Sequence, residues 1–142
     1  MAAYTEAPVL RRPPVSVLLA VPLAVLSALV TAFFGVIALA FSDGQYDDGN
    51  WLVIALPALL AGCLLAGALL LLTGRSWLAV FLPAAALVAV VVWAVLAAGV
   101  GEDTGGLLVL SWALPAGAAV LSALPGVRRW VAGRRLERLT PA

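Results

Sequence analysis

The chain has 142 residues, of which 65% are hydrophobic and only 11% are charged, and its formal net charge is +1. A soluble domain is typically about half apolar and about a quarter charged, so a soluble fold of this length has too little interior to hide so much apolar surface. The single cysteine and the absence of histidine exclude an intramolecular disulfide and a Cys/His zinc site, and the near-neutral charge gives no indication of nucleic-acid binding.

Four apolar segments without a charged side chain follow one another along the chain, at residues 15–41, 51–72, 77–100 and 107–125. A helix needs about 20 apolar residues to cross a bilayer, and in lipid only a helix or a closed barrel pairs every backbone group. The segments lack the short alternating pattern of barrel strands. We therefore predict an all-α integral membrane protein with four transmembrane helices.

Short connections join these segments. Links of this length force consecutive helices to lie antiparallel and adjacent, and none has room for a soluble domain. The predicted organisation is an N-terminal tail at residues 1–14, a four-helix transmembrane domain at 15–126 and a basic C-terminal tail at 127–142.

The charged residues fall on two different sides of this arrangement. The eight basic residues are all arginines, and they precede the first segment, lie in the second connection or follow the fourth segment: Arg11, Arg12, Arg75, Arg128, Arg129, Arg134, Arg135 and Arg138. The first and third connections carry only acids: Asp43, Asp47, Asp48, Glu102 and Asp103. The positive-inside rule then places both termini in the cytoplasm. The use of arginine without lysine, with the Ala/Leu/Val/Gly bias, is typical of a GC-rich bacterium, so we expect a multi-pass protein of the bacterial cytoplasmic membrane.

A cleaved signal peptide is the alternative for the first segment. Arg11 and Arg12 resemble the basic region of such a peptide, and Ala38-Leu39-Ala40 resembles its cleavage site. The apolar stretch of a signal peptide is only about 7–15 residues long, which is much shorter than this segment. We expect the segment to be retained; cleavage would leave three helices without changing the orientation of the rest.

The acidic first connection invites comparison with a calcium loop. Asp43, Gln45 and Asp47 imitate its first, third and fifth ligand positions. Asp48 then stands where the loop requires glycine, and Ile54 stands where it requires glutamate. We expect a solvated turn, with a weak surface cation site as the alternative, and we predict no metal or cofactor site.

Other patterns concern helix packing. Residues 51–58 and 77–84 share the pattern W-L-x-x-x-L-P-A, which indicates either a duplication or a chance match among few residue types. Small residues recur at helical spacing, which predicts close packing along two stripes: Ser16, Ala20, Ala24, Ala28 and Ala32, and Ala58, Gly62 and Ala66. On this basis, Gly62→Leu should disturb folding more than Leu71→Ala. Cys63 is expected to be a small buried apolar residue.

The hydroxyl residues within the segments, the tryptophans at their ends and the C-terminal tail allow further predictions. The hydroxyls of Ser27, Thr31, Ser111 and Ser122 are expected to bond to backbone or across helices, and Trp51, Trp77 and Trp130 are expected to anchor the protein at the membrane surfaces. On a helical wheel the arginines of the tail do not separate from its apolar residues. The tail is therefore predicted to be a basic segment that is attracted to anionic lipid.

The sequence has no constellation typical of an enzyme. It lacks a nucleophile–base pair and a phosphate-binding glycine loop, and Glu102 and Asp103 are simply neighbours in a connection. We expect a small non-enzymatic membrane protein without cofactors, which acts through helix–helix association as an accessory or structural subunit. Its expected partners are membrane lipids and either copies of itself or a larger membrane complex. Two alternatives stay open: an oligomeric uncoupled transporter or channel, and a phage-type membrane-permeabilising protein. Coupled transport is disfavoured because no carboxylate lies within the apolar segments.

Overall fold

The computed structural model describes residues 12–41, 51–98 and 105–139, and this part of the chain is helical without any strand. The helices are α1 (Val15–Phe41), α2 (Trp51–Leu72), α3 (Leu78–Ala98), α4 (Gly105–Ala123) and α5 (Pro125–Leu139). The all-α prediction is confirmed. The first two predicted segments coincide with α1 and α2, and α4 begins and ends two residues earlier than its predicted segment.

Proline and glycine mark the ends of these helices. The Pro14 carbonyl accepts the Val17 N–H at 2.9 Å, which closes the first turn of α1. Gly74, with a φ of 65°, ends α2 in the left-handed conformation that favours glycine. Pro125 begins α5, where its fixed φ suits the first helical position and its missing N–H leaves no bond unmade.

Three of the helices are long and apolar enough to cross a membrane. The qualifying stretches are Val15–Phe41, Ala55–Leu72 and Leu78–Ala97. Within α4, the stretch Ser111–Ala123 is apolar but shorter. The described chain is thus a helical protein with membrane-compatible segments, and the fourth crossing stays a prediction.

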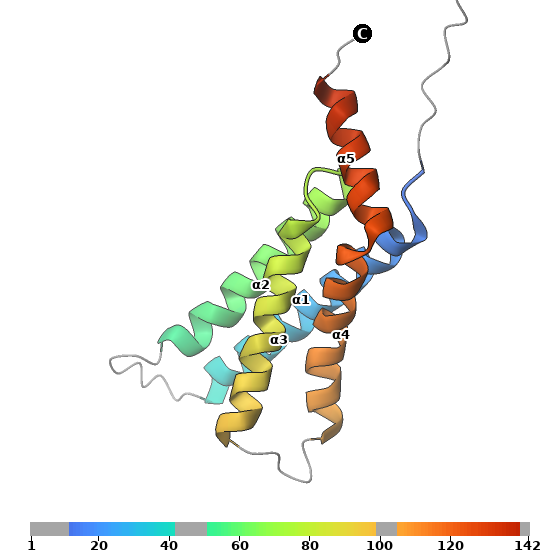
Figure 1. The fold of residues 1–142 in the computed structure, drawn as a ribbon. Coiled ribbons are helices and arrows are strands. Elements are labelled where there is room, and N and C mark those ends of the chain that lie inside the picture. Colours follow the sequence, from blue (N-terminus) through green and yellow to red (C-terminus); the bar gives the residue numbers. More distant parts are fainter. Residues whose placement is uncertain (1–11, 42–50, 99–104, 140–142) are drawn as a thin grey trace, which may run out of the picture.

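The four longer helices pack side by side. α1 and α3 each contact both α2 and α4, while α5 touches α4 and the beginning of α1. In Figure 1 the start of α1, the end of α2, the start of α3 and the end of α4 lie at one end of the molecule, together with α5. We call this end the basic end, because all the arginines of the described residues lie there.

Two groups of buried apolar side chains hold the helices together. The basic-end cluster contains Val17, Ala20, Ala24, Ala68, Leu71, Val80, Ala118, Val127, Trp130 and Val131. The mid cluster contains Ala28, Leu60, Ala61, Leu64, Ala84, Leu87 and Ala119. Alanine is common in both, so the helix backbones approach closely, which is the usual basis of helix packing where lipid removes the hydrophobic drive.

The stripe of small residues predicted on α1 is confirmed over its middle. Ala20, Ala24 and Ala28 are buried, as are Ser27 and Thr31 beside them. The predicted bonding of the hydroxyls to backbone is confirmed at three positions. Ser27 Oγ donates to the Leu23 carbonyl at 2.7 Å, Thr31 Oγ1 donates to the Ser27 carbonyl at 2.7 Å, and Ser122 Oγ donates to the Ala119 carbonyl at 2.9 Å. These hydroxyls are satisfied within their own helices.

The stripe predicted on α2 is wrong. Ala58, Gly62 and Ala66 are exposed, and a Cβ added to Gly62 would meet no atom within 4 Å. The buried face of α2 is the neighbouring one, which carries Leu60, Ala61, Leu64, Gly67, Ala68 and Leu71. Cys63 is also exposed on the protein surface, so the expectation that it is buried is corrected as well. Because α2 is apolar on every side, small residues alone do not reveal which side meets protein.

Gly67 provides the close approach that was expected at Gly62. A Cβ on Gly67 would clash with the carbonyl oxygen of Ala79, and it would lie 2.7 Å from the carbonyl carbon and 3.1 Å from the Val80 nitrogen. These atoms are backbone, so they cannot move aside without moving α3. Gly67 therefore sets how closely α2 and α3 approach each other at the basic end.

Candidate functional site at the basic end

The chemistry-bearing side chains of the described residues gather outside the apolar helices. α1 to α4 contain no charged side chain over their described lengths, and no group of metal-ligating residues occurs within the described ranges. The acidic residues Asp43, Asp47, Asp48, Glu102 and Asp103 lie outside the described residues. The candidate site is therefore the basic end, where α5 packs against the turn between α2 and α3.

The turn after α2 has a defined hydrogen-bond pattern. The Gly74 N–H bonds the Leu71 carbonyl at 2.9 Å, and the Arg75 N–H bonds the Leu70 carbonyl at 2.8 Å. These are the two bonds of a Schellman motif, with Gly74 in the left-handed position. Thr73 Oγ1 adds a bond to the Leu70 carbonyl at 3.1 Å. The motif stops α2 and fixes the direction in which the chain leaves it.

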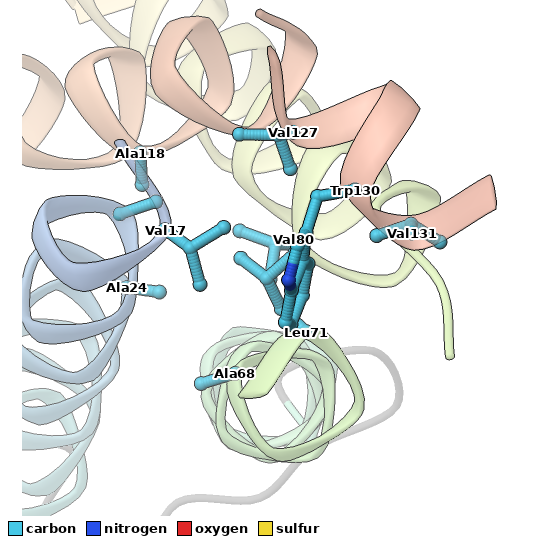
Figure 2. Close-up of a cluster of buried hydrophobic side chains, with 10 residues drawn as sticks. Val17, Ala24, Ala68, Leu71, Val80, Ala118, Val127, Trp130 and Val131 are labelled. Atoms are coloured by element: carbon cyan, nitrogen blue, oxygen red, sulfur yellow. The ribbon is translucent and has the colours of Figure 1, made fainter. Parts of the chain in front are cut away.

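The first turns of α5 insert an apolar face into the basic-end cluster. Val127 is fully buried, and Trp130 and Val131 are 7% and 6% exposed. The spacing i, i+3, i+4 places these three on one side of the helix. Figure 2 shows the Trp130 side chain reaching from α5 among Val17, Val80 and Leu71. α5 is thus docked on α1, α2 and α3 through the side chains of this cluster.

Trp130 brings a polar group into this apolar surrounding. Its Nε1 is buried and has no hydrogen-bond partner in the described part of the chain. An unpaired buried donor costs about 1–3 kcal/mol. The large apolar contact of the indole outweighs that cost, because truncating a buried tryptophan to alanine typically costs about 3–5 kcal/mol.

The second half of the same face carries arginines instead of apolar residues. Arg138 Nη2 donates to the Thr73 carbonyl at the end of α2. The Arg134 guanidinium lies 5.7 Å from the Trp130 ring centroid, and its side chain covers the space above Gly74. A Cβ on Gly74 would meet Arg134 Cγ at 3.1 Å and Trp130 at 3.3 Å. Both arginines bring positive charge to the negative end of the α2 dipole.

Arg128 occupies a different position, at the start of α3. Its guanidinium carbon lies 4.1 Å from the centroid of the Trp77 ring, which is within the range of a cation–π interaction. Trp77 in turn packs against Phe81, with ring centroids 5.7 Å apart. The Trp77 indole therefore contacts both Phe81 of α3 and Arg128 of α5.

The described residues at this end carry a strong excess of positive charge. The arginines are Arg12, Arg75, Arg128, Arg129, Arg134, Arg135 and Arg138, and Glu137 is the one acid among the described residues. Most of these guanidinium groups therefore have no carboxylate of the described chain to neutralise them. Guanidinium groups bind phosphate and carboxylate groups through paired N–H donors.

The sequence placed the arginines at one end correctly but misjudged two features there. Trp130 was expected to anchor the protein at a membrane surface, and it is instead a buried core residue. The tail was expected to lack an apolar face, yet Val127, Trp130 and Val131 form one over its first two turns. The i, i+3, i+4 spacing of these residues is the signal that identifies it. Trp51, by contrast, is 61% exposed, as a surface anchor would be.

Comparison with known proteins yields no family for this chain. No family model matches it, and neither the curated proteins nor the solved structures contain a significant match. The function must therefore be argued from the residues and from the arrangement of the helices.

Proposed function

We propose that this chain is a non-enzymatic protein of the bacterial cytoplasmic membrane that crosses the bilayer four times and acts by helix association, as an accessory or structural subunit. The observation that carries the proposal is the separation of apolar surface from charge. Large apolar side chains are exposed along the helices, for example Leu29 at 59%, Trp93 at 71% and Leu96 at 79%. A contiguous apolar surface of this extent marks contact with lipid or protein rather than water.

The length and direction of α4 support the proposal of a fourth crossing. α4 has 19 residues, which corresponds to a helix of about 28 Å and matches a hydrocarbon layer of about 30 Å. Its N-terminal end lies in Figure 1 at the end of the molecule opposite the basic end, and its C-terminal end leads into the basic α5. Under this proposal the basic end faces the cytoplasm, because arginine-rich ends are retained there.

The proposal of an association role rests on the chemistry of the spans. Ser27, Thr31 and Ser122 bond within their own helices, so these hydroxyls are not presented to a substrate. α3 is the least covered of the membrane-compatible helices, with 17% of its apolar window buried against 33% for α1 and for α2. The exposed side of α3 is therefore the surface on which we expect another membrane helix to pack.

Three measurements test this proposal. Reporter fusions after residues 44, 74 and 103 should report the outside, the cytoplasm and the outside, and a cytoplasmic signal at residue 44 would contradict the topology.

Extraction from native membranes in a mild detergent should yield a complex larger than the 14.5 kDa protomer. Crosslinking from Leu96→Cys in a Cys63→Ala background should report that contact. A monodisperse protomer without crosslinks would refute the association role.

A further inference from the structure

We propose that Arg128 and Trp77 form a binding site for the phosphate headgroup of an anionic phospholipid, at the edge where α5 crosses the start of α3. The proposal rests on the membrane location put forward above, and it names a specific partner for the basic end. It differs from general attraction to anionic lipid because it assigns the contact to one of the chain's eight arginines.

The geometry of the cation–π pair leaves the binding groups of Arg128 available. The central carbon of the guanidinium lies over the Trp77 ring, 4.1 Å from the ring centroid. The N–H donors of a guanidinium lie in its plane and point outward from its edge. The contact with Trp77 therefore restrains the side chain, and because Arg128 is exposed, the donors that point away from the ring are accessible to a ligand. An arginine held in this way loses little conformational freedom when it binds a phosphate in bidentate fashion.

Neighbouring positive charge strengthens the site. Arg75 lies two residues before Trp77, and Arg129 follows Arg128; both are exposed. α3 begins at Leu78, so the positive end of its dipole also lies beside the Trp77 ring. Together these groups favour a ligand with net negative charge over a zwitterion, in which the phosphate is balanced by an attached cation.

Apolar side chains beside Arg128 identify the ligand as a lipid rather than a free phosphate. Leu124 is 38% exposed and precedes Arg128 by one helical turn, and Leu78 is 43% exposed and follows Trp77 directly. Leu124 directly follows the end of α4, and Leu78 is the first residue of α3, so both lie at the ends of apolar helices. A ligand that fits this edge combines an anionic head with an apolar chain.

The other arginines provide controls. Arg134 and Arg138 already contact Trp130 and the Thr73 carbonyl, so changing them would disturb the docking of α5. Arg135 lies two turns beyond Arg128 on the same helix and is exposed. Arg135→Gln therefore removes the same charge from nearly the same side of α5 without touching Trp77.

The test uses the full chain in detergent, with bound lipid counted by native mass spectrometry. Phosphatidylglycerol and phosphatidylcholine with identical acyl chains are titrated against the wild type and against Arg128→Gln, Arg128→Lys, Trp77→Leu and Arg135→Gln. Thermal unfolding of each variant establishes that it is folded. Glycerol phosphate is added as a competitor, in order to separate a lipid site from a site for phosphate esters in general.

We expect the wild type to bind phosphatidylglycerol about fivefold more tightly than phosphatidylcholine, the factor that corresponds to about one arginine near an anionic surface. Arg128→Gln and Trp77→Leu should abolish this preference. Arg128→Lys should lose most of it, because an ammonium group is not planar and cannot bind a phosphate through two parallel N–H donors as a guanidinium does. Arg135→Gln should keep it. Equal losses in Arg128→Gln and Arg135→Gln would overturn the site in favour of diffuse attraction, as would a folded Arg128→Lys variant with full preference.

The remaining outcomes separate the two proposals. Equal binding of both lipids by the wild type refutes the headgroup site while leaving the membrane location intact. Failure to retain either lipid refutes the membrane location itself. Displacement of phosphatidylglycerol by glycerol phosphate at millimolar concentration would assign the site to soluble phosphate esters and so overturn its assignment to a lipid.

Discussion

Replacing Gly67 with alanine should separate α2 from α3. The new Cβ would clash with the Ala79 carbonyl oxygen and lie 3.1 Å from the Val80 nitrogen, and both atoms belong to the backbone of a helix that is itself packed against α4. Overpacking of this kind typically costs about 1–3 kcal/mol. In lipid the separated helices have no hydrophobic drive to compensate, so we expect the upper part of this range.

Helix propensity acts in the opposite direction, because alanine favours a helix more than glycine does. The Gly62→Ala variant on the same helix measures this contribution to the free energy of unfolding. Alanine stabilises a helix interior by up to about 1 kcal/mol relative to glycine. Gly62 has open space around its Cβ position, so Gly62→Ala should be neutral or slightly stabilising. Gly67→Ala gains the same propensity but loses the contact, which leaves a net destabilisation of about 1–2 kcal/mol.

Equilibrium unfolding in mixed detergent and SDS micelles, followed by circular dichroism, is a suitable assay. Each alanine variant adds one methyl group to the wild type, at positions five residues apart, so their effects on the micelle and on the denatured state are closely matched. We expect the free energies of unfolding to differ by about 2–3 kcal/mol. Equal stabilities, or a more stable Gly67→Ala variant, would show that α2 and α3 do not approach at Gly67.

Three further predictions concern the core, α5 and transport. Leu71→Ala should cost about 2–5 kcal/mol because Leu71 is fully buried, whereas Leu69→Ala, at a side chain 64% exposed, should change the same unfolding free energy little. Trp130→Ala should release α5, and limited trypsin digestion should then cut at its arginines at least about tenfold faster, as expected if docking weakens by more than ~1.4 kcal/mol. The Trp130→Phe variant should be cut at nearly the wild-type rate, because phenylalanine keeps most of the packing and removes the unpaired Nε1; wild-type cutting rates in both variants would show that the indole is not the docking element. Purified protein in liposomes should show no substrate-dependent proton flux under an imposed pH gradient, because the described spans contain no acid or histidine; flux abolished by one substitution within a span would promote the transporter alternative.

The positions of the helices could be predicted from the sequence because the responsible signals are local. An uninterrupted apolar run sets the length of α1 and α2, and Pro14 and Gly74 close their ends through bonds to residues a few positions away. The gathering of arginines at one end was equally predictable. Short connections make consecutive helices antiparallel, so the second connection and both tails lie at the same end of the molecule.

The buried face of α2 could not be predicted in this way. In water a helix reveals its inner face by its polar outer face, but α2 is apolar all round. It also carries small residues on two sides, with Gly62 on the exposed side and Gly67 on the buried side. Only the position of the Ala79 carbonyl distinguishes the two glycines, and that position depends on a separate helix.

The docking of α5 was missed for a different reason. Over the whole tail, arginines share a face with apolar residues, which is unfavourable if that face meets a uniform apolar surface. The actual surface changes along the helix. Trp130 meets the apolar cluster, whereas Arg138, about two turns further on, meets the carbonyl of Thr73. A helical wheel projects all turns of the helix onto one circle, so it does not show that the apolar and the basic parts of this face meet different surfaces.

The bond between Arg138 and Thr73 joins residues 65 positions apart, and this separation has a consequence for biosynthesis. α2, the Gly74 turn and α3 are synthesised before residues 125–139. During that interval Leu71 and Val80 lack the Trp130 side chain that later covers them, and the end of α2 lacks its arginine. Until α5 is synthesised, this end of the α2–α3 hairpin therefore has no apolar cover from Trp130. A translation product that stops before α5 would keep that end permanently open, which is a feature that chaperones and membrane proteases recognise.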